Sequence, residues 1–333
     1  MAHISKIFVL GGTGFLGYYT TKELLAQGYQ VKTMALPPMP ADNLLPSTVE
    51  LSLGNINELS DAQVVDLLSD CDGFMYAAGA DERALPEAPA LSFYYHANVL
   101  PTQRLARLAR QAGVKNFVVF GSYTAEFASL WRDTYPDYQL QPYPNTRLLQ
   151  EQVAFAEGEG AMTVTVLRLP YIFGTMPGRM PLWKMFVDQI RNQPVYPALK
   201  GSTSAVTVEQ VAEAAVGALQ HGEHRHTYAI NAYNLAYKDF YDMIVEALHQ
   251  ETMTQVPVVP FDQLKPQFEQ LDAQTAAAGK EHGIHITLSE KLQEEAQCTD
   301  PDETAILGIK DHDVVASIKA TLAKCVEADE PAN

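Results

Sequence analysis

Three glycines near the N-terminus are spaced so that they could hold a dinucleotide. They are Gly11, Gly14 and Gly17, and they directly follow an apolar run that ends at Leu10. In a strand–turn–helix unit, the first glycine of such a set permits a tight turn, the second lets a pyrophosphate approach the backbone, and the third lets the helix pack closely on the strand. The start of the helix adds free N–H groups and a dipole that favours phosphate. The segment therefore predicts a dinucleotide site, whose loop also contains Thr13, Phe15 and Leu16.

The end of the second expected strand normally contacts the adenosine ribose of such a cofactor. An acidic side chain there accepts a hydrogen bond from the 2′-hydroxyl of NAD, whereas an arginine holds the phosphate of NADP. This chain has Ala35 and Leu36 at that position, followed by two prolines. The sequence therefore leaves the choice between NAD and NADP open.

The segments that must position this turn alternate between strand-like and helix-like patterns. Strand-like runs lie at residues 4–10, 30–36, 49–53, 74–78, 116–120 and 162–169. Helix-like stretches lie between them, at residues 15–27, 61–69, 95–113 and 147–157. Because strands that alternate with helices favour a parallel sheet covered on both faces, we expect an α/β fold of the doubly wound, Rossmann type. The uninterrupted apolar run 117–120 fits a sheet that is buried on both sides.

The pattern changes after Pro170, where prolines punctuate a loop-rich segment. A helix-like stretch at 206–219 and a strand-like run at 227–230 form one further pair, and the pattern beyond Asn234 is mostly helical. We therefore expect a dinucleotide-binding domain made of residues 1–170 and 203–233. The remaining residues, 171–202 and 234–333, would form a smaller, mostly helical substrate lobe.

The composition excludes several other classes of protein. The 333 residues contain 40 acidic and 23 basic side chains, a net charge of -17, which opposes non-specific binding to nucleic acid or to an anionic membrane. No apolar run approaches the roughly 18 residues of a membrane span. Three scattered cysteines argue against a disulfide framework, and the histidines at 221–226 lack partners for a metal site. We expect a soluble cytoplasmic protein without a metal.

Further segments agree in order and spacing with one known family. They are Gly54-Asn55-Ile56, Tyr76-Ala77-Ala78-Gly79, Asn98-Val99, Gly113 to Phe117 and Leu167 to Gly174. With the glycine turn, they make the chain resemble the extended (atypical) short-chain dehydrogenase/reductases, the NAD-dependent epimerase/dehydratase-like family. The resemblance implies cofactor contacts at Asn55, Ile56, Ala77, Ala78, Gly79 and Asn98, and implies that Pro170, Tyr171 and Ile172 border the nicotinamide.

The resemblance also implies a catalytic tyrosine, a lysine four residues later and an upstream hydroxyl. Tyr143 stands in the tyrosine position, and Arg147 stands in the lysine position. The upstream hydroxyl aligns most naturally with Tyr123, which is flanked by Ser122 and Thr124. Arg147 and Tyr123 therefore depart from the family pattern.

Arginine in the lysine position preserves part of the chemistry. A phenol with a pKa of roughly 10 must be adjusted to exchange protons at neutral pH. A cation one helical turn away favours the phenolate, and Arg147 can also donate hydrogen bonds to ribose hydroxyls. Arg147 cannot release a proton, so no proton relay can pass through it.

Three functions fit these observations. We expect an NAD(P)-dependent oxidoreductase that acts on a small carbonyl or alcohol, as a homodimer paired through helices near 95–111 and 143–157. A sugar-nucleotide epimerase or dehydratase is the first alternative. Such family members resemble one another in using an arginine before the segment equivalent to 206–211, and residues 202–205 contain none, while Gln210 replaces an aspartate. A cofactor-binding sensor or scaffold that has lost catalysis is the second alternative.

Overall fold

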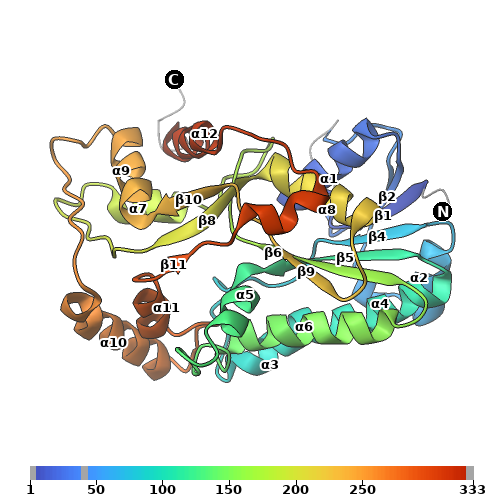
Figure 1. Ribbon diagram of the computed structural model, residues 1–333, viewed down its shortest axis with the longest axis horizontal. Helices are drawn as coiled ribbons and strands as arrows, with labels where there is room; N and C mark the ends of the chain where they lie inside the picture. The colour runs from blue at the N-terminus through green and yellow to red at the C-terminus, as the bar shows by residue number, and fades with distance from the viewer. Residues whose placement is uncertain (1–4, 39–43, 328–333) are drawn as a thin grey trace.

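Seven parallel strands form the central sheet of the computed structural model, which describes residues 5–38 and 44–327 (Figure 1). The strand order is β3-β2-β1-β4-β5-β6-β9. Their bounds are β1 Lys6–Leu10, β2 Gln30–Ala35, β3 Glu50–Leu53, β4 Gly73–Tyr76, β5 Asn116–Ser122, β6 Thr163–Leu169 and β9 His226–Ala229. Every strand expected from the sequence is present, and the doubly wound α/β fold is confirmed.

Helices cover both faces of this sheet (Figure 1). One face is covered by α2 Asp61–Leu68, α4 Leu100–Ala112 and α6 Pro142–Gly158, which share a core with Phe74 and Phe117. The other face is covered by α1 Phe15–Ala26 and α8 Val208–His221, which pack on Val9 and Val118. A short helix, α3 Ala90–Tyr94, and a π-helical turn, η2 Tyr95–Val99, lead into α4. A second short helix, η1 Ile56–Glu58, precedes α2.

A second, four-stranded sheet lies beside the first. It consists of β10 Tyr233–Ala236, β8 Ser202–Thr207, β11 Ala296–Gln297 and β7 Tyr171–Phe173. Around it lie α7 Lys184–Ile190, α9 Tyr237–Ala247, α10 Phe261–Ala277, α11 Ile286–Leu292, η3 Pro301–Leu307 and α12 Val314–Glu327. The sequence pattern did not reveal this sheet, in part because β7 and β11 contain only three and two residues. The division of the chain into a dinucleotide domain and a substrate lobe stays an interpretation.

The first turn of α8 shows how a side chain sets a helix boundary. The Thr207 side chain accepts from the backbone N–H of Gln210, and the Gln210 side chain accepts in return from the N–H of Thr207. This capping box fixes the helix start at Val208. The helix expected from Val206 therefore begins two residues later, and Val206 belongs to β8.

The glycine-rich turn follows β1, at the point where the strand order reverses. From β1 the chain continues to β2 and β3 on one side and then crosses to β4 on the other. Gly11 has a φ of +84°, and a Cβ added to Gly17 would lie 2.2 Å from the carbonyl oxygen of Gly11. Only glycine at position 17 therefore lets α1 approach β1 this closely. Ligands of open α/β sheets bind in the crevice at such a reversal.

One buried arginine holds together the elements that surround this crevice. Arg168 on β6 donates to the Glu151 carboxylate of α6 at 2.9 and 2.6 Å. It also donates to Glu126 of α5 Tyr123–Leu130 at 2.5 Å. Arg168 is 8% exposed and Glu151 is 2% exposed, so the pair has little contact with water.

Among the helices of the described residues, none has the length and apolar character that a membrane span requires.

Replacing Arg168 should destabilise the fold strongly. Arg168→Met leaves the Glu151 carboxylate buried without its cation, and we expect a loss of about 3–5 kcal/mol in the free energy of unfolding. Lys319→Met removes the exposed ion pair with Glu246 and is the matched control, with an expected loss below about 1 kcal/mol. Urea denaturation of the three proteins measures both values. Equal losses in the two variants would contradict the role of Arg168.

Candidate active site

A cavity of about 520 Å³ lies at the carboxyl ends of the central strands. The glycine turn, the ends of β4 and β5, the start of α6 and the β6–β7 connection all contribute to its wall. The residues predicted from the sequence that line it are Gly14, Phe15, Leu16, Gly17, Ala77, Ala78, Gly79, Ser122, Tyr123, Thr124, Tyr143, Arg147, Pro170, Tyr171 and Ile172. The fold thus brings together segments that are far apart in the chain.

The other predicted cofactor residues stand outside this lining. Asn98 is fully buried and holds the backbone of Ala80, accepting from its N–H at 2.8 Å and donating to its carbonyl at 3.0 Å. Asn55 caps the short helix η1, and Ile56 is part of the core. The remaining ones are Gly11, Thr13, Ala35 and Leu36. Asn98 therefore shapes the loop beside the cavity, and cofactor contacts at these residues stay predictions.

Tyr143 lies in the first turn of α6, behind Pro142. Its side chain is 2% exposed and packs edge-to-face on the ring of Tyr94 at 5.3 Å between centroids. Its backbone N–H donates to the carbonyl of Gly283 at 2.8 Å, so a segment of the C-terminal part covers it. Burial raises the pKa of Tyr143 to about 12, against the opposing effects of the Arg147 charge and the Ser122 hydroxyl.

Arg147 lies one turn further along α6, with its guanidinium 5.0 Å from the ring centroid of Tyr143. Nη1 donates to the Gln150 side chain at 2.7 Å, and Nη2 donates to the carbonyl of Ala80 at 3.3 Å. Gln150 is itself held by Thr102 at 2.8 Å. Within the described residues, the buried Nε of Arg147 has no hydrogen-bond partner. The guanidinium is therefore fixed in place, and its Nε–H remains unused.

The three hydroxyls at the end of β5 have different surroundings. Ser122 caps α5, accepting from the N–H of Thr124 at 3.2 Å and from its hydroxyl at 3.0 Å. Tyr123 packs among aromatic rings, 6.2 Å from Tyr171 and 5.8 Å from Phe127. The Ser122 hydroxyl opposes the burial that raises the pKa of Tyr143, and Ser122 and Tyr123 both stay candidates for the family's hydroxyl. The sequence alignment favoured Tyr123.

The cavity wall also contains residues that the sequence analysis did not single out, among them Glu82 after β4, Arg179 and Trp183 after β7, and Glu290 on α11. Burial raises the pKa of Glu290 to about 7 and also raises that of Glu82. In the sequence, the charged ones among them have the same pattern as solvated surface positions, so nothing marked them.

Comparison with known proteins identifies the family. Residues 7–234 match the model of the NAD dependent epimerase/dehydratase family. The chain belongs to this family. Membership confirms the resemblance seen in the sequence, and the family's name states dependence on NAD.

Individual members of the family are more distant. The chain is 31% identical over 118 residues to a putative dihydroflavonol 4-reductase from Synechocystis sp., covering 35% of this chain and 33% of that protein. It is 28% identical over 193 residues to UDP-glucose 4-epimerase from Bacillus subtilis, covering 51% of this chain and 54% of that protein. The chain thus aligns with about half or less of these relatives' length.

Solved structures share the fold over the whole chain. The crystal structure of gox2253 has a TM-score of 0.75 at 18% identity and covers 98% of this chain and 99% of its own. MoeE5 in complex with UDP-glucuronic acid and NAD has a TM-score of 0.64 at 19% identity, covering 98% of this chain and 100% of its own. At this level of identity, the likeness concerns the fold alone.

The residues of this family member fit the cofactor that the family name implies. The first turn of α1 has no side-chain cap and adjoins the cavity, so its N–H groups are available to a pyrophosphate. A Cβ added to Gly14 would lie 3.2 Å from the carbonyl oxygen of Gly11, which shows how closely the turn is folded. The unused Nε of Arg147 suits a ribose hydroxyl. Suitable hydrogen-bond donors are therefore present for both the pyrophosphate and the ribose of the cofactor.

Arg179 should strengthen binding of the cofactor's pyrophosphate. Its guanidinium lies 3.8 Å from the position of a Cβ on Gly14, and it forms no ion pair with any other described residue. Because hydrogen bonds to charged groups are worth about 1.5–3 kcal/mol, we expect Arg179→Ala to weaken NADH binding roughly tenfold. Arg132→Ala makes the same charge change on an exposed residue outside the cavity and is the control. Fluorescence titration with NADH measures the affinity of both variants. An unchanged affinity of Arg179→Ala would contradict a contact between Arg179 and the pyrophosphate.

Proposed function

We propose that the protein is an NAD(P)-dependent oxidoreductase that interconverts a carbonyl compound and its alcohol. The observation that carries the proposal is the buried Tyr143 phenol at the cavity wall, with Arg147 below it and the Ser122 hydroxyl beside it. When bound, the nicotinamide supplies or accepts a hydride. In carbonyl reduction, Tyr143 donates its proton to the substrate oxygen as that oxygen gains charge.

Arg147 and Ser122 assist Tyr143 in this scheme. The guanidinium charge stabilises the phenolate that remains after proton transfer. The Ser122 hydroxyl holds the substrate oxygen beside the phenol. Because Arg147 cannot release a proton, Tyr143 recovers its proton from water in the cavity, without a relay through this side chain.

A sugar-nucleotide epimerase remains the second candidate, because several relatives support it. UDP-glucose 4-epimerase from Bacillus subtilis is among the matching proteins, and MoeE5 has been crystallised with UDP-sugars. The strand β8 gives this candidate less support, because its residues Ser202 to Ala205 contain no cation for a diphosphate. A turnover screen over simple ketones, aldehydes and nucleotide sugars separates the two candidates, and the absence of any turnover would favour the sensor or scaffold.

The pH dependence of turnover tests the role of Tyr143. Since its pKa lies near 12, the phenolate fraction should rise about tenfold per pH unit between roughly pH 7 and 9. The rate of alcohol oxidation, which needs the phenolate as base, should rise with pH in that range. Carbonyl reduction needs the phenol, which remains the main form up to roughly pH 9, so proton donation by Tyr143 should not change the rate of reduction there. Tyr143→Phe should lower both rates roughly a hundred- to ten-thousand-fold while NADH binding is kept.

Substitutions of Arg147 provide the control for this experiment. Arg147→Lys keeps the charge below the phenol and should keep activity, whereas Arg147→Ala should lower oxidation and weaken NADH binding. A Tyr143→Phe variant with unchanged turnover would exclude this site as the centre of the reaction.

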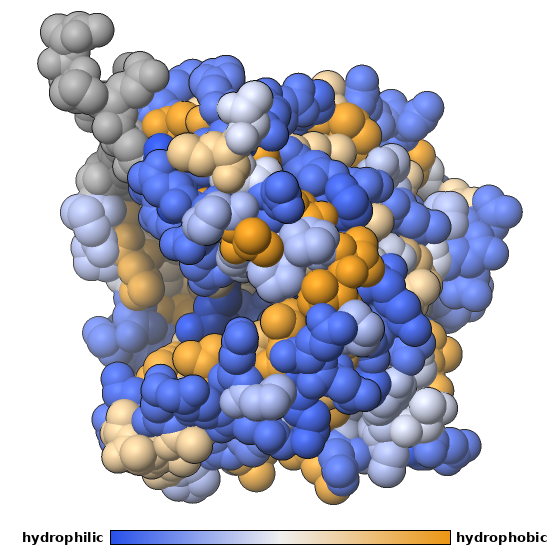
Figure 2. All heavy atoms as spheres, turned by 90° about the vertical axis from the view of Figure 1, so that its left-hand side faces the viewer, coloured by the Kyte–Doolittle hydropathy of each residue, from blue (hydrophilic) through white to orange (hydrophobic). Residues whose placement is uncertain are grey.

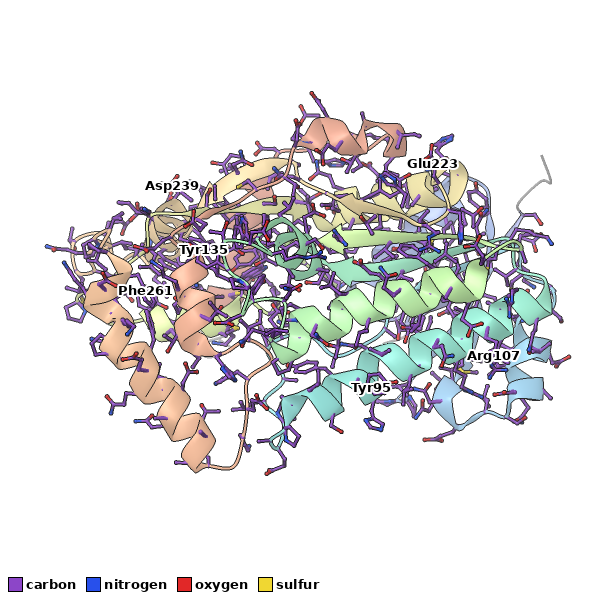
Figure 3. The ribbon with its side chains drawn as sticks, turned by 60° about the horizontal axis from the view of Figure 1, so that its bottom comes forward. Tyr95, Arg107, Tyr135, Glu223, Asp239 and Phe261 are labelled. Atoms are coloured by element: carbon purple, nitrogen blue, oxygen red, sulfur yellow. The ribbon has the colours of Figure 1, made fainter. Side chains whose placement is uncertain are left out.

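We also propose that the protein works as a homodimer. The helices α4 and α6 lie side by side on one outer face, and Tyr95 lies at the start of the same face (Figure 3). Apolar side chains on this face are 38–44% exposed: Leu91, Tyr95, Leu100 and Leu149. Such a patch on adjoining helices is typical of a protein interface.

Light scattering tests the dimer. The wild type should have the mass of two chains at micromolar concentration, and Leu149→Glu should shift it towards one. Leu130→Glu changes a leucine that is 62% exposed at the end of α5 and should leave the mass unchanged. A wild-type protein with the mass of one chain would refute the proposal.

A further inference from the structure

The positively charged side chains of the cavity lie on the side where the cofactor is expected, near Gly14 and Tyr143. Among the described residues that line it, the cations are Arg83, Arg147 and Arg179. Arg83 is paired with Asp81, Arg147 is held below Tyr143, and Arg179 stands beside Gly14. The wall contributed by α7, α9 and α11 contains none. This end of the molecule faces the viewer in Figure 2, where the surface is hollowed.

Carboxyl groups line the cavity where a substrate would lie, and Glu290 is negatively charged above the pKa of about 7 that burial gives it. Glu290 of α11 is half-buried and lines the cavity, and its side-chain carboxylate forms no hydrogen bond or ion pair with another described residue. Glu82 lines the cavity from the loop after β4, and both carboxylates lie close enough to act on the phenol of Tyr171. A diphosphate brought between these groups would meet repulsion and no compensating cation.

The adjoining part of the cavity wall, formed by Tyr171 and Trp183, is aromatic and rigidly held. Trp183 donates from its indole N–H to the carbonyl of Ile172 at 2.9 Å. Its ring stacks on Phe173 at 4.6 Å and lies 4.8 Å from the ring of Tyr171. An apolar face that is fixed in this way suits a flat ring better than a sugar phosphate.

We infer that this half of the cavity binds an uncharged, ring-containing carbonyl compound whose hydroxyl group donates a hydrogen bond to Glu290, and that it excludes the diphosphate of a nucleotide sugar. The inference rests on the proposed oxidoreductase function and names its substrate class. The free carboxylate supplies an acceptor that no protein group uses, and the ring lies against the wall formed by Tyr171 and Trp183. Burial removes water molecules that would otherwise hydrogen-bond to Glu290, and a hydrogen bond from the substrate hydroxyl compensates for that loss.

Calorimetric titration of the full-length protein saturated with NAD⁺ tests the inference. The probes are 4′-hydroxyacetophenone, acetophenone, which lacks only the hydroxyl, and UDP-glucose. At about pH 8.5, above the pKa of about 7 that burial gives Glu290, the hydroxylated ketone should bind the wild type at least about tenfold more tightly than acetophenone, because the extra hydrogen bond is made to a charged group. UDP-glucose should bind more weakly than either ketone.

Variants of Glu290 test whether this residue accepts the hydrogen bond from the substrate hydroxyl. Glu290→Leu should remove the preference for 4′-hydroxyacetophenone and keep the affinity for acetophenone, and Glu290→Gln, which retains an uncharged acceptor, should lie between. Glu269→Leu makes the same change on an exposed residue of α10 and should behave as the wild type.

Three results would overturn the inference: tighter binding of UDP-glucose than of the ketones, an unchanged hydroxyl preference in Glu290→Leu, or no binding of either ketone to a protein that does bind NAD⁺. A wild-type protein that fails to bind NAD⁺ would instead refute the proposed function from which the inference starts.

Discussion

A buried guanidinium without a carboxylate partner among the described residues is the constraint on which the candidate site depends. Arg147 is 7% exposed in a chain with a net charge of -17, yet its hydrogen bonds go to an amide side chain and a carbonyl. An acidic partner would neutralise the charge and remove its effect on Tyr143. The supporting groups are therefore neutral: Gln150, Thr102 and the Ala80 loop that Asn98 holds. The charge stays available to the phenol and to a ligand.

The sequence contains enough to predict the fold and the phosphate end of the site. Alternating apolar segments determine the sheet, and the spacing of Gly11, Gly14 and Gly17 has a steric meaning that requires no knowledge of distant residues. The second sheet could not be predicted in this way, because β7 and β11 contain three and two residues. The position of the upstream hydroxyl is equally ambiguous, since Ser122 and Tyr123 are neighbours at the end of a strand, where successive side chains point in opposite directions.

The family match covers most of the candidate site and leaves out one residue of the proposed substrate wall. The match ends at residue 234, and α9 begins at Tyr237. Tyr143, to which proton transfer is assigned, lies inside the matched region together with Tyr171 and Trp183, whereas Glu290 lies outside it. Relatives named as epimerases and as reductases can therefore share the matched part and differ at positions such as that of Glu290.

The position of β9 has a consequence for how the chain can fold. β9 pairs with β6 at the border of the central sheet, although the strands β7 and β8 of the second sheet come between them in the sequence. A nascent chain that has been synthesised only as far as Pro170 therefore presents β6 as an unpaired, apolar border strand, which is a template for aggregation. The strand β9 can complete the central sheet only after β7 and β8 have been synthesised. The two sheets are thus interleaved in synthesis, and neither can be excised by a single cut in the polypeptide.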